Sequence, residues 1–198
     1  MKTQVFCFVI SSILTLFVGF AFLPFLRKLK LKQPILKYVG EHKSKSGTPT
    51  MGGLFFIVGG VFTFLIFNGV NDRLANLTIA ITLGFMVVGF IDDFLKIKYK
   101  HNEGLSVIQK LVFQLLVSII ASYFAYQSGL DFLYLPFSKV KVSLGVYVIF
   151  LNVFVFIATV NSVNLTDGLD GLCASVSLFV LLAFAVLIIL QSSVFEVA

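Results

Sequence analysis

The sequence predicts an all-α polytopic membrane protein with six transmembrane helices in a single domain over residues 1–198. The first observation is composition, because 59% of the residues are hydrophobic and 12% are charged. Soluble domains are about half apolar and about a quarter charged. The second observation is that the apolar residues form six long runs, and the third is that the basic residues gather in two loops. A water-soluble domain with this composition would lack the polar residues to cover its surface.

Each of the six runs is long enough to supply the roughly 20 mostly apolar residues that a helix needs to cross a bilayer. In order they cover about residues 4–26, 51–70, 74–93, 111–130, 142–160 and 172–193. The first run is predicted to be a retained helix, because it is too long for the apolar core of a signal peptide and is followed by basic residues rather than a cleavage site. The alternation Lys-Val-Lys-Val from Lys139 suggests a small hairpin before the fifth run.

The basic residues orient these helices. Seven of the fifteen Lys and Arg residues lie in the loop after the first run, and four lie in the loop after the third. Cytoplasmic loops are enriched in Lys and Arg. The first, third and fifth loops are therefore predicted to be cytoplasmic, with the N-terminus outside.

Three polar segments interrupt the apolar pattern on the predicted cytoplasmic side. The first, residues 41–53, leads straight into the second run. Pro49 indicates an irregular backbone, and Thr48 or Thr50 can cap the helix that follows. Lys45 beside a helix N-terminus would suit an anionic phosphate. The alternative interpretation is a basic loop that only orients the chain and leads into a helix.

The second polar segment reads GFIDDFLKIKYK over residues 89–100. If the helix continues, Asp92, Lys96 and Lys100 share one face. Adjacent acids at the end of an apolar span are unfavourable unless they have a partner or a function. Asp92 and Asp93 suit Mg²⁺, proton transfer or both, and the lysines suit phosphates. The alternative is a helix end with a surface ion pair.

The third polar segment reads NSVNLTDGLDGL over residues 161–172 and joins the fifth and sixth runs. Asn164, Asp167 and Asp170 recur every three residues, so a single helical turn would bring them together. Gly168 allows backbone or ligand to come close. The alternative is a polar turn between two spans. Together the three segments suit metal-assisted chemistry on a phosphorylated substrate.

The strings HKSKSGTPTMGG, GFIDDFLKIKYK and NSVNLTDGLDGL resemble the phospho-N-acetylmuramoyl-pentapeptide transferases. These enzymes form a branch of the polyprenyl-phosphate N-acetylhexosamine-1-phosphate transferase superfamily. The resemblance implies transfer of phospho-N-acetylmuramoyl-pentapeptide from its UDP derivative to undecaprenyl phosphate, with Mg²⁺ as cofactor. It implies lipid I and UMP as products, and a place in the bacterial inner (plasma) membrane with the active site cytoplasmic. A homodimer is one expected assembly, and no nucleic acid is expected as a partner.

The resemblance also assigns roles by motif position. Asp92 is expected next to the lipid phosphate as base or orienting group, and Asp93 and Asp167 are expected to act in catalysis and to support the metal. Direct attack by the lipid phosphate and a covalent aspartyl-phosphate route both stay open. The expected substrate-binding positions are Lys45, Thr50, Lys96, Lys100, Asn164, Gly168 and Asp170.

One departure from the family is expected to matter. The family normally has ten transmembrane helices, and its later part carries a further Mg²⁺-binding aspartate and a histidine-rich loop. The sequence has two histidines, His42 and His101, and no matching aspartate after Asp170. We therefore expect an N-terminal portion of the enzyme, with the main Mg²⁺ ligand beyond the chain end. The alternatives are an inactive membrane fragment and a sister transferase that uses a UDP-N-acetylhexosamine without the peptide. A transporter is disfavoured because no ionisable residue lies at the centre of a run.

Overall fold

A computed structural model describes residues 2–28, 51–68, 73–99, 104–135, 140–167 and 171–195. Helices dominate these residues, as the sequence predicts. The elements are α1 (Lys2–Lys28), α2 (Gly53–Asn68), α3 (Arg73–Tyr99), α4 (Val107–Gln127), β1 (Phe132–Tyr134), β2 (Lys141–Ser143), the 3-10 helix η2 (Gly145–Tyr147), α5 (Val148–Thr166) and α6 (Leu172–Phe195). Each of the six predicted runs contains or overlaps one α-helix of the described chain, which confirms the predicted fold class.

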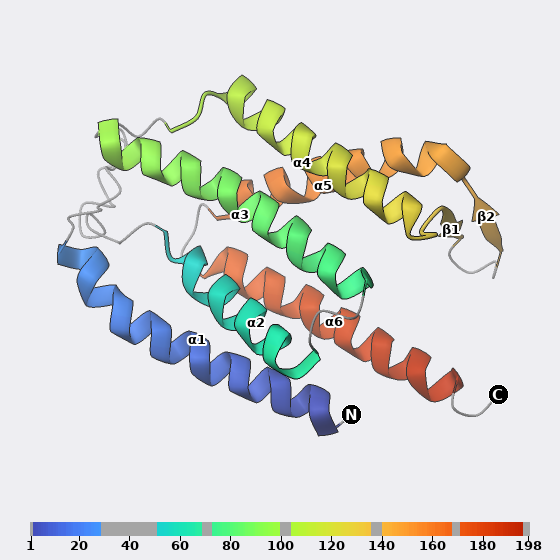
Figure 1. The fold of residues 1–198 in the computed structure, drawn as a ribbon, viewed down its shortest axis with the longest axis horizontal. Coiled ribbons are helices and arrows are strands. Elements are labelled where there is room, and N and C mark those ends of the chain that lie inside the picture. The colour runs from blue at the N-terminus through green and yellow to red at the C-terminus, as the bar shows by residue number, and fades with distance from the viewer. Residues whose placement is uncertain are drawn as a thin grey trace. The chain divides into compact units, whose positions relative to one another are not determined.

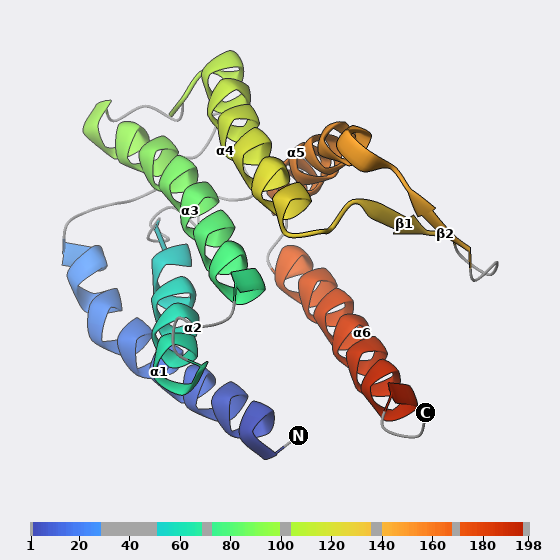
Figure 2. The ribbon, with the colours of Figure 1, turned by 45° about the vertical axis from the view of Figure 1, so that its right-hand side comes forward.

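The chain divides into two compact units, residues 1–153 and 154–198. In the first unit, α1 packs along α2, α3 packs along α4, and α2 also contacts α3 (Figures 1 and 2). The helices α3 and α4 run antiparallel, and the Arg73 guanidinium at the start of α3 donates to the carbonyl of Gln127 at the end of α4, at 3.2 Å. The second unit holds most of α5 and all of α6.

The described surface is mostly apolar, and polar side chains lie between helices. Phe8, Phe17 and Phe20 of α1 are all more than two-thirds exposed. By contrast, the most deeply buried side chains include Gln114, Ser118 and Ser122 on α4. Soluble proteins place their residues the other way round, whereas helices in lipid pack through small and weakly polar residues. The distribution is that of a multi-pass membrane protein.

Four of the described helical segments are long and apolar enough to cross a membrane, judged by length and composition. They are Phe6–Pro24, Arg73–Tyr99, Val107–Gln127 and Gly145–Thr166. Two shorter apolar segments, Gly53–Phe67 and Leu172–Leu187, belong to α2 and α6. All six therefore fall on the predicted runs.

Glycines allow the helix pairs of the first unit to come close. A Cβ at Gly59 of α2 would overlap the side chain of Thr15 on α1 and lie 3.2 Å from its Cα. A Cβ at Gly84 of α3 would lie 2.9 Å from a methyl group of Val117 on α4. Both values are shorter than ordinary van der Waals contact. These two contacts place α1 against α2 and α3 against α4.

Three predicted boundaries are wrong, and two of these errors affect the polar segments. The predicted third run ends at residue 93, but α3 continues to Tyr99, so the acids and Lys96 all lie within one helix. The predicted fifth run begins at residue 142, but β2 occupies Lys141–Ser143, and Gly145, the first residue of η2, takes a positive φ of 51°. The hairpin itself is confirmed, with Leu133 paired antiparallel with Val142. The predicted fifth run ends at residue 160, but α5 continues to Thr166, so the first half of the third polar segment is helical rather than a loop.

Candidate active site

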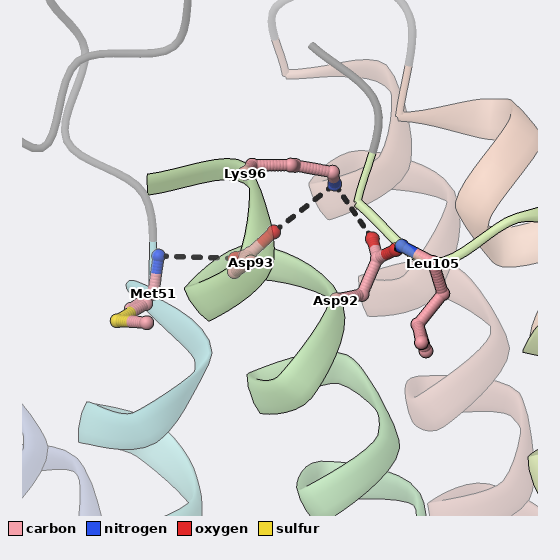
Figure 3. A network of polar contacts seen from close by, with 5 residues as sticks. All are labelled: Met51, Asp92, Asp93, Lys96 and Leu105. Carbon is pink, nitrogen blue, oxygen red and sulfur yellow. Dashed lines mark hydrogen bonds and ion pairs between the residues drawn. The ribbon is translucent and has the colours of Figure 1, made fainter. Parts of the chain in front are cut away.

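The last turns of α3 bring together two carboxylates and one ammonium (Figure 3). The Nζ of Lys96 lies 2.6 Å from Oδ2 of Asp92 and 3.2 Å from Oδ1 of Asp93. Residues three and four positions apart lie on the same side of a helix, so both acids can reach the lysine from its own helix. The sequence predicted from spacing that Asp92 and Lys96 share one face of the helix, and the first of these contacts confirms this.

Asp92 is held from outside its helix as well. The backbone N–H of Leu105 donates to Oδ1 of Asp92 at 2.9 Å, a typical length for this bond. Each oxygen of this carboxylate therefore has a donor, and the side chain is only 12% exposed. A carboxylate at the end of an apolar span needs such partners, because burying an unpaired charge is strongly unfavourable.

Asp93 has the same number of partners but longer contacts. Its Oδ2 accepts from the backbone N–H of Met51 at 3.3 Å, just before α2 begins. Its side chain is 30% exposed, more than twice the exposure of Asp92. Met51 has a φ of 68°, a conformation that non-glycine residues seldom adopt. The tighter geometry makes Asp92 the fixed acid and Asp93 the more exchangeable one.

The cluster carries one negative charge in excess, because one ammonium faces two carboxylates. Lys98, two positions further on, is exposed, and its Nζ lies 5.6 Å from the ring of Tyr99. The Lys98 ammonium therefore lies near the Tyr99 ring. The excess negative charge of these three side chains would attract an additional cation.

The resemblance implies a magnesium ion, and Asp93 is suited to supply part of its ligand set. Across the described portion of the chain, no three His, Cys, Asp or Glu side chains lie close enough to hold a metal ion. Mg²⁺ commonly takes one or two carboxylates and fills its octahedral shell with water and substrate phosphates. Asp93 offers hard oxygen ligands whose present contacts are long. It can therefore supply one ligand to such an ion.

The third polar segment belongs to the second unit. Asn164 and Asp167 lie at the end of α5, three positions apart, and both are exposed. The backbone N–H of Asp167 donates to the carbonyl of Val163 at 3.2 Å, so the helical geometry continues up to this acid. The predicted sharing of one turn by Asn164 and Asp167 agrees with this geometry. Five of the predicted site residues lie outside the described residues: Lys45, Thr50, Lys100, Gly168 and Asp170.

Sequence reasoning missed the backbone partners of both acids. The pattern Ser-Val-Ile-Gln at residues 106–109 could have revealed the start of α4, because a Ser or Thr followed three positions later by Glu or Gln is a capping box. In the structure, Ser106 and Gln109 form that box, with both bonds present. Leu105 immediately precedes it. No local pattern predicts that Leu105 or Met51 would meet α3.

Residues 75–198 match the family model described as glycosyl transferase family 4, which is more than half of the chain. The chain therefore belongs to glycosyl transferase family 4. This stretch contains the acid–lysine cluster and the third polar segment. Residues 45–57 match a shorter pattern, described as phospho-N-acetylmuramoyl-pentapeptide-transferase signature 1, which runs into the start of α2.

Several curated relatives carry the name phospho-N-acetylmuramoyl-pentapeptide-transferase. One from a Thermoanaerobacter species is 47% identical over 177 residues, covering 89% of this chain and 55% of the relative. One from Caldanaerobacter subterraneus is 41% identical over 191 residues, covering 96% of this chain and 60% of the relative. One from Clostridium novyi is 40% identical over 190 residues, covering 94% and 58%. The chain thus spans a little over half the length of these relatives.

Proposed function

We propose that this chain is part of an enzyme that transfers phospho-N-acetylmuramoyl-pentapeptide from its UDP derivative to undecaprenyl phosphate. The products would be lipid I and UMP, and the reaction would be the first membrane step of peptidoglycan synthesis. The observation that supports it most is Lys96 held between two acids at the end of α3, in a chain that also matches the signature of this transferase. Because the chain spans just over half of its named relatives, the activity is proposed for the complete protein.

The proposed step is a single exchange at phosphorus. A phosphate oxygen of undecaprenyl phosphate forms a bond to the β-phosphorus of the UDP-sugar. The bond between that phosphorus and the oxygen it shares with the α-phosphate breaks, and UMP leaves with that oxygen. Such reactions need little covalent help from the protein, so catalysis comes from positioning and from stabilising charge.

The contacts of the cluster support a division of roles. Lys96 would donate to the diphosphate as charge moves onto it, and Asp92 would fix the direction of Lys96 through its contact of 2.6 Å. Asp93, with its longer contacts, would exchange them for a hydrated Mg²⁺. When bound, Mg²⁺ would neutralise charge on the phosphates. The proposed roles of Asn164 and Asp167 rest on the resemblance of their motif alone. The remaining proposed substrate contacts are Lys45, Thr50, Lys100, Gly168 and Asp170.

The surroundings of Asp92 favour direct attack by the lipid phosphate over a covalent aspartyl-phosphate route. Both of its oxygens already accept from strong donors, Lys96 and the Leu105 N–H. A carboxylate engaged at both oxygens is a weaker nucleophile, because each donor stabilises its negative charge. Incubation with UDP-N-acetylmuramoyl-pentapeptide but without undecaprenyl phosphate distinguishes the two routes. Direct attack releases no UMP under these conditions, whereas a stoichiometric release would establish the covalent route.

The orientation in the membrane is proposed from the distribution of Lys and Arg residues among the loops. Eleven of the fifteen basic residues lie in the loops after the first and third predicted runs. These loops would face the cytoplasm of a bacterial cell across the inner membrane, with the N-terminus outside. The end of α3 would then lie on the cytoplasmic side, where the UDP-sugar is available. A homodimer stays a prediction.

The test measures lipid I and UMP from UDP-N-acetylmuramoyl-pentapeptide, undecaprenyl phosphate and Mg²⁺ in lipid nanodiscs. The chain is assayed alone and as a hybrid, in which it replaces the matched part of the Thermoanaerobacter relative. We expect the hybrid to form lipid I, and Asp92→Asn to lower its kcat roughly a hundredfold or more.

Asp131→Asn serves as the matched control, because Asp131 lies beside the β1–β2 hairpin, where it accepts a 3.3 Å hydrogen bond from Ser143. A UDP-N-acetylhexosamine without the peptide serves as the alternative donor. A folded hybrid that forms no lipid I would refute the proposed function. If the hybrid prefers the donor without the peptide, the proposed function is wrong and the enzyme is the sister transferase that uses a UDP-N-acetylhexosamine.

A further inference from the structure

We propose that Gly104 is a positioning residue for Asp92, because its missing side chain lets the segment before α4 close onto the end of α3. The close approach allows the backbone N–H of Leu105 to fix one oxygen of the Asp92 carboxylate. The close approach itself follows from the contacts of Gly104 and Leu105 with Asp92. Its consequence for catalysis rests on the proposed transfer reaction.

The space at Gly104 is too small for any side chain. A Cβ built there would overlap the main-chain carbonyl oxygen of Asp92. It would also lie 2.5 Å from Oδ1 and 2.9 Å from Cγ of the same residue. The carbonyl belongs to the hydrogen-bonded backbone of α3 and cannot swing aside as a flexible side chain could. Even an alanine at this position would have to push the segment away from Asp92.

The segment is fixed on its other side by the start of α4. Ser106 is the N-cap, its side chain accepts from the N–H of Gln109, and the Gln109 side chain accepts from the N–H of Ser106. Such a capping box defines the direction in which the chain enters the helix. Leu105 is therefore held next to a rigid element, with its own N–H directed at Asp92 (Figure 3).

This contact determines which way the Asp92 carboxylate faces. With Oδ1 held by Leu105, Oδ2 is directed at Lys96, 2.6 Å away. Without the Leu105 contact, the carboxylate could rotate about its last bond, and Lys96 would lose one of its two fixed partners. Gly104 thus acts on Lys96 through Asp92, without reaching the cluster with a side chain of its own.

The first experiment follows hydrogen exchange of the Leu105 amide in nanodiscs, in the complete chain. Gly104→Ala and Asp92→Ala should each speed this exchange about tenfold or more, the value expected for loss of a hydrogen bond to a charged group. The double variant should be no faster than the faster single one, because the same bond is lost only once. Gly89→Ala is the matched control. Gly89 lies on α3 about one turn before Asp92, and a Cβ there would meet nothing within 4 Å.

Unchanged Leu105 exchange in a folded Gly104→Ala variant would overturn the proposal, and so would additive effects in the double variant. If Gly104→Ala does not fold, as judged by far-UV circular dichroism, the Asp92→Ala variant provides the test. Unchanged Leu105 exchange in that variant would show that the Leu105–Asp92 hydrogen bond is absent, which would overturn the proposal.

The second experiment measures kinetics in the hybrid enzyme described above. Gly104→Ala should lower kcat by up to about a hundredfold and leave KM for the UDP-sugar within a few-fold, because a displaced catalytic group affects the chemical step most. A raised KM with unchanged kcat would contradict positioning through Asp92. If the hybrid makes no lipid I at all, the proposed reaction fails, while the exchange experiment still decides the role of Gly104.

Discussion

Replacing each acid of the cluster in turn with asparagine should destabilise the protein by unequal amounts. Asp92 accepts from Lys96 at 2.6 Å and from the Leu105 N–H at 2.9 Å, with 12% of its side chain exposed. Asp93 accepts from Lys96 at 3.2 Å and from the Met51 N–H at 3.3 Å, with 30% exposed. The shorter and more buried contacts belong to Asp92, so its charge contributes more.

The magnitude follows from the chemistry of the amide. An asparagine at position 92 has one acceptor and one donor group, yet both of its partners are donors. It can satisfy the Leu105 N–H only by turning its NH₂ group toward the Lys96 ammonium. A hydrogen bond to a charged group contributes about 1.5–3 kcal/mol, so Asp92→Asn should lower the free energy of unfolding by about 2 kcal/mol. Asp93→Asn should lower it by about 1 kcal/mol or less, because longer contacts are weaker and water can replace them.

The measurement is reversible unfolding in mixed micelles with increasing sodium dodecyl sulfate, followed by far-UV circular dichroism. The chain has no Trp, so helix content is a better signal than intrinsic fluorescence. Asp131→Asn provides the control for loss of a partly exposed carboxylate outside the cluster. Equal losses for the two acids, or a larger loss for Asp93→Asn, would refute the assignment of Asp92 as the fixed acid.

Two further predictions concern helix packing and use the same unfolding measurement. Gly59→Ala should destabilise the α1–α2 pair by about 1–3 kcal/mol, because its Cβ would overlap Thr15. Gly60→Ala is the control and should be neutral or slightly stabilising, since a Cβ there meets nothing within 4 Å. Similar losses for both variants would contradict the close packing at Gly59. Gly84→Ala should destabilise the α3–α4 pair by about 1–2 kcal/mol, because its Cβ would lie 2.9 Å from Val117. Adding Val117→Ala should recover part of that loss, and strictly additive losses would show that the two residues do not touch.

Local patterns predicted much of the fold. Runs of apolar residues located all six α-helices of the described chain, because length and hydrophobicity are sufficient to identify a membrane span. The alternation around Val142 predicted the hairpin that β1 and β2 form. The helix ends were predicted less well. Apolar residues define the third run, and they do not reveal its charged extension through Lys96 to Tyr99, because a helix in a membrane protein continues past the apolar region into the polar interface.

The candidate site was predictable only where its contacts are local. Spacing of four residues is sufficient to pair Asp92 with Lys96. The contact of Asp93 with Met51 joins residues 42 positions apart, and that of Asp92 with Leu105 joins residues 13 apart. Both use the backbone N–H of the partner, which every residue but proline offers. The sequence therefore does not show which residue is the partner, and only the fold reveals it.

The two adjacent acids make sense once their directions are considered. Neighbouring residues on an α-helix point about 100° apart, so outside their own helix Asp92 and Asp93 face different partners. Asp92 reaches Leu105 in the segment before α4, and Asp93 reaches Met51, two residues before α2 begins. Lys96 lies between them and pairs with both. A single acid could hold the lysine and the segment before one of these helices, but the pair holds the lysine and the segments before α2 and α4 at one point. This is a structural reason for a doubled acid that a surface ion pair would not require.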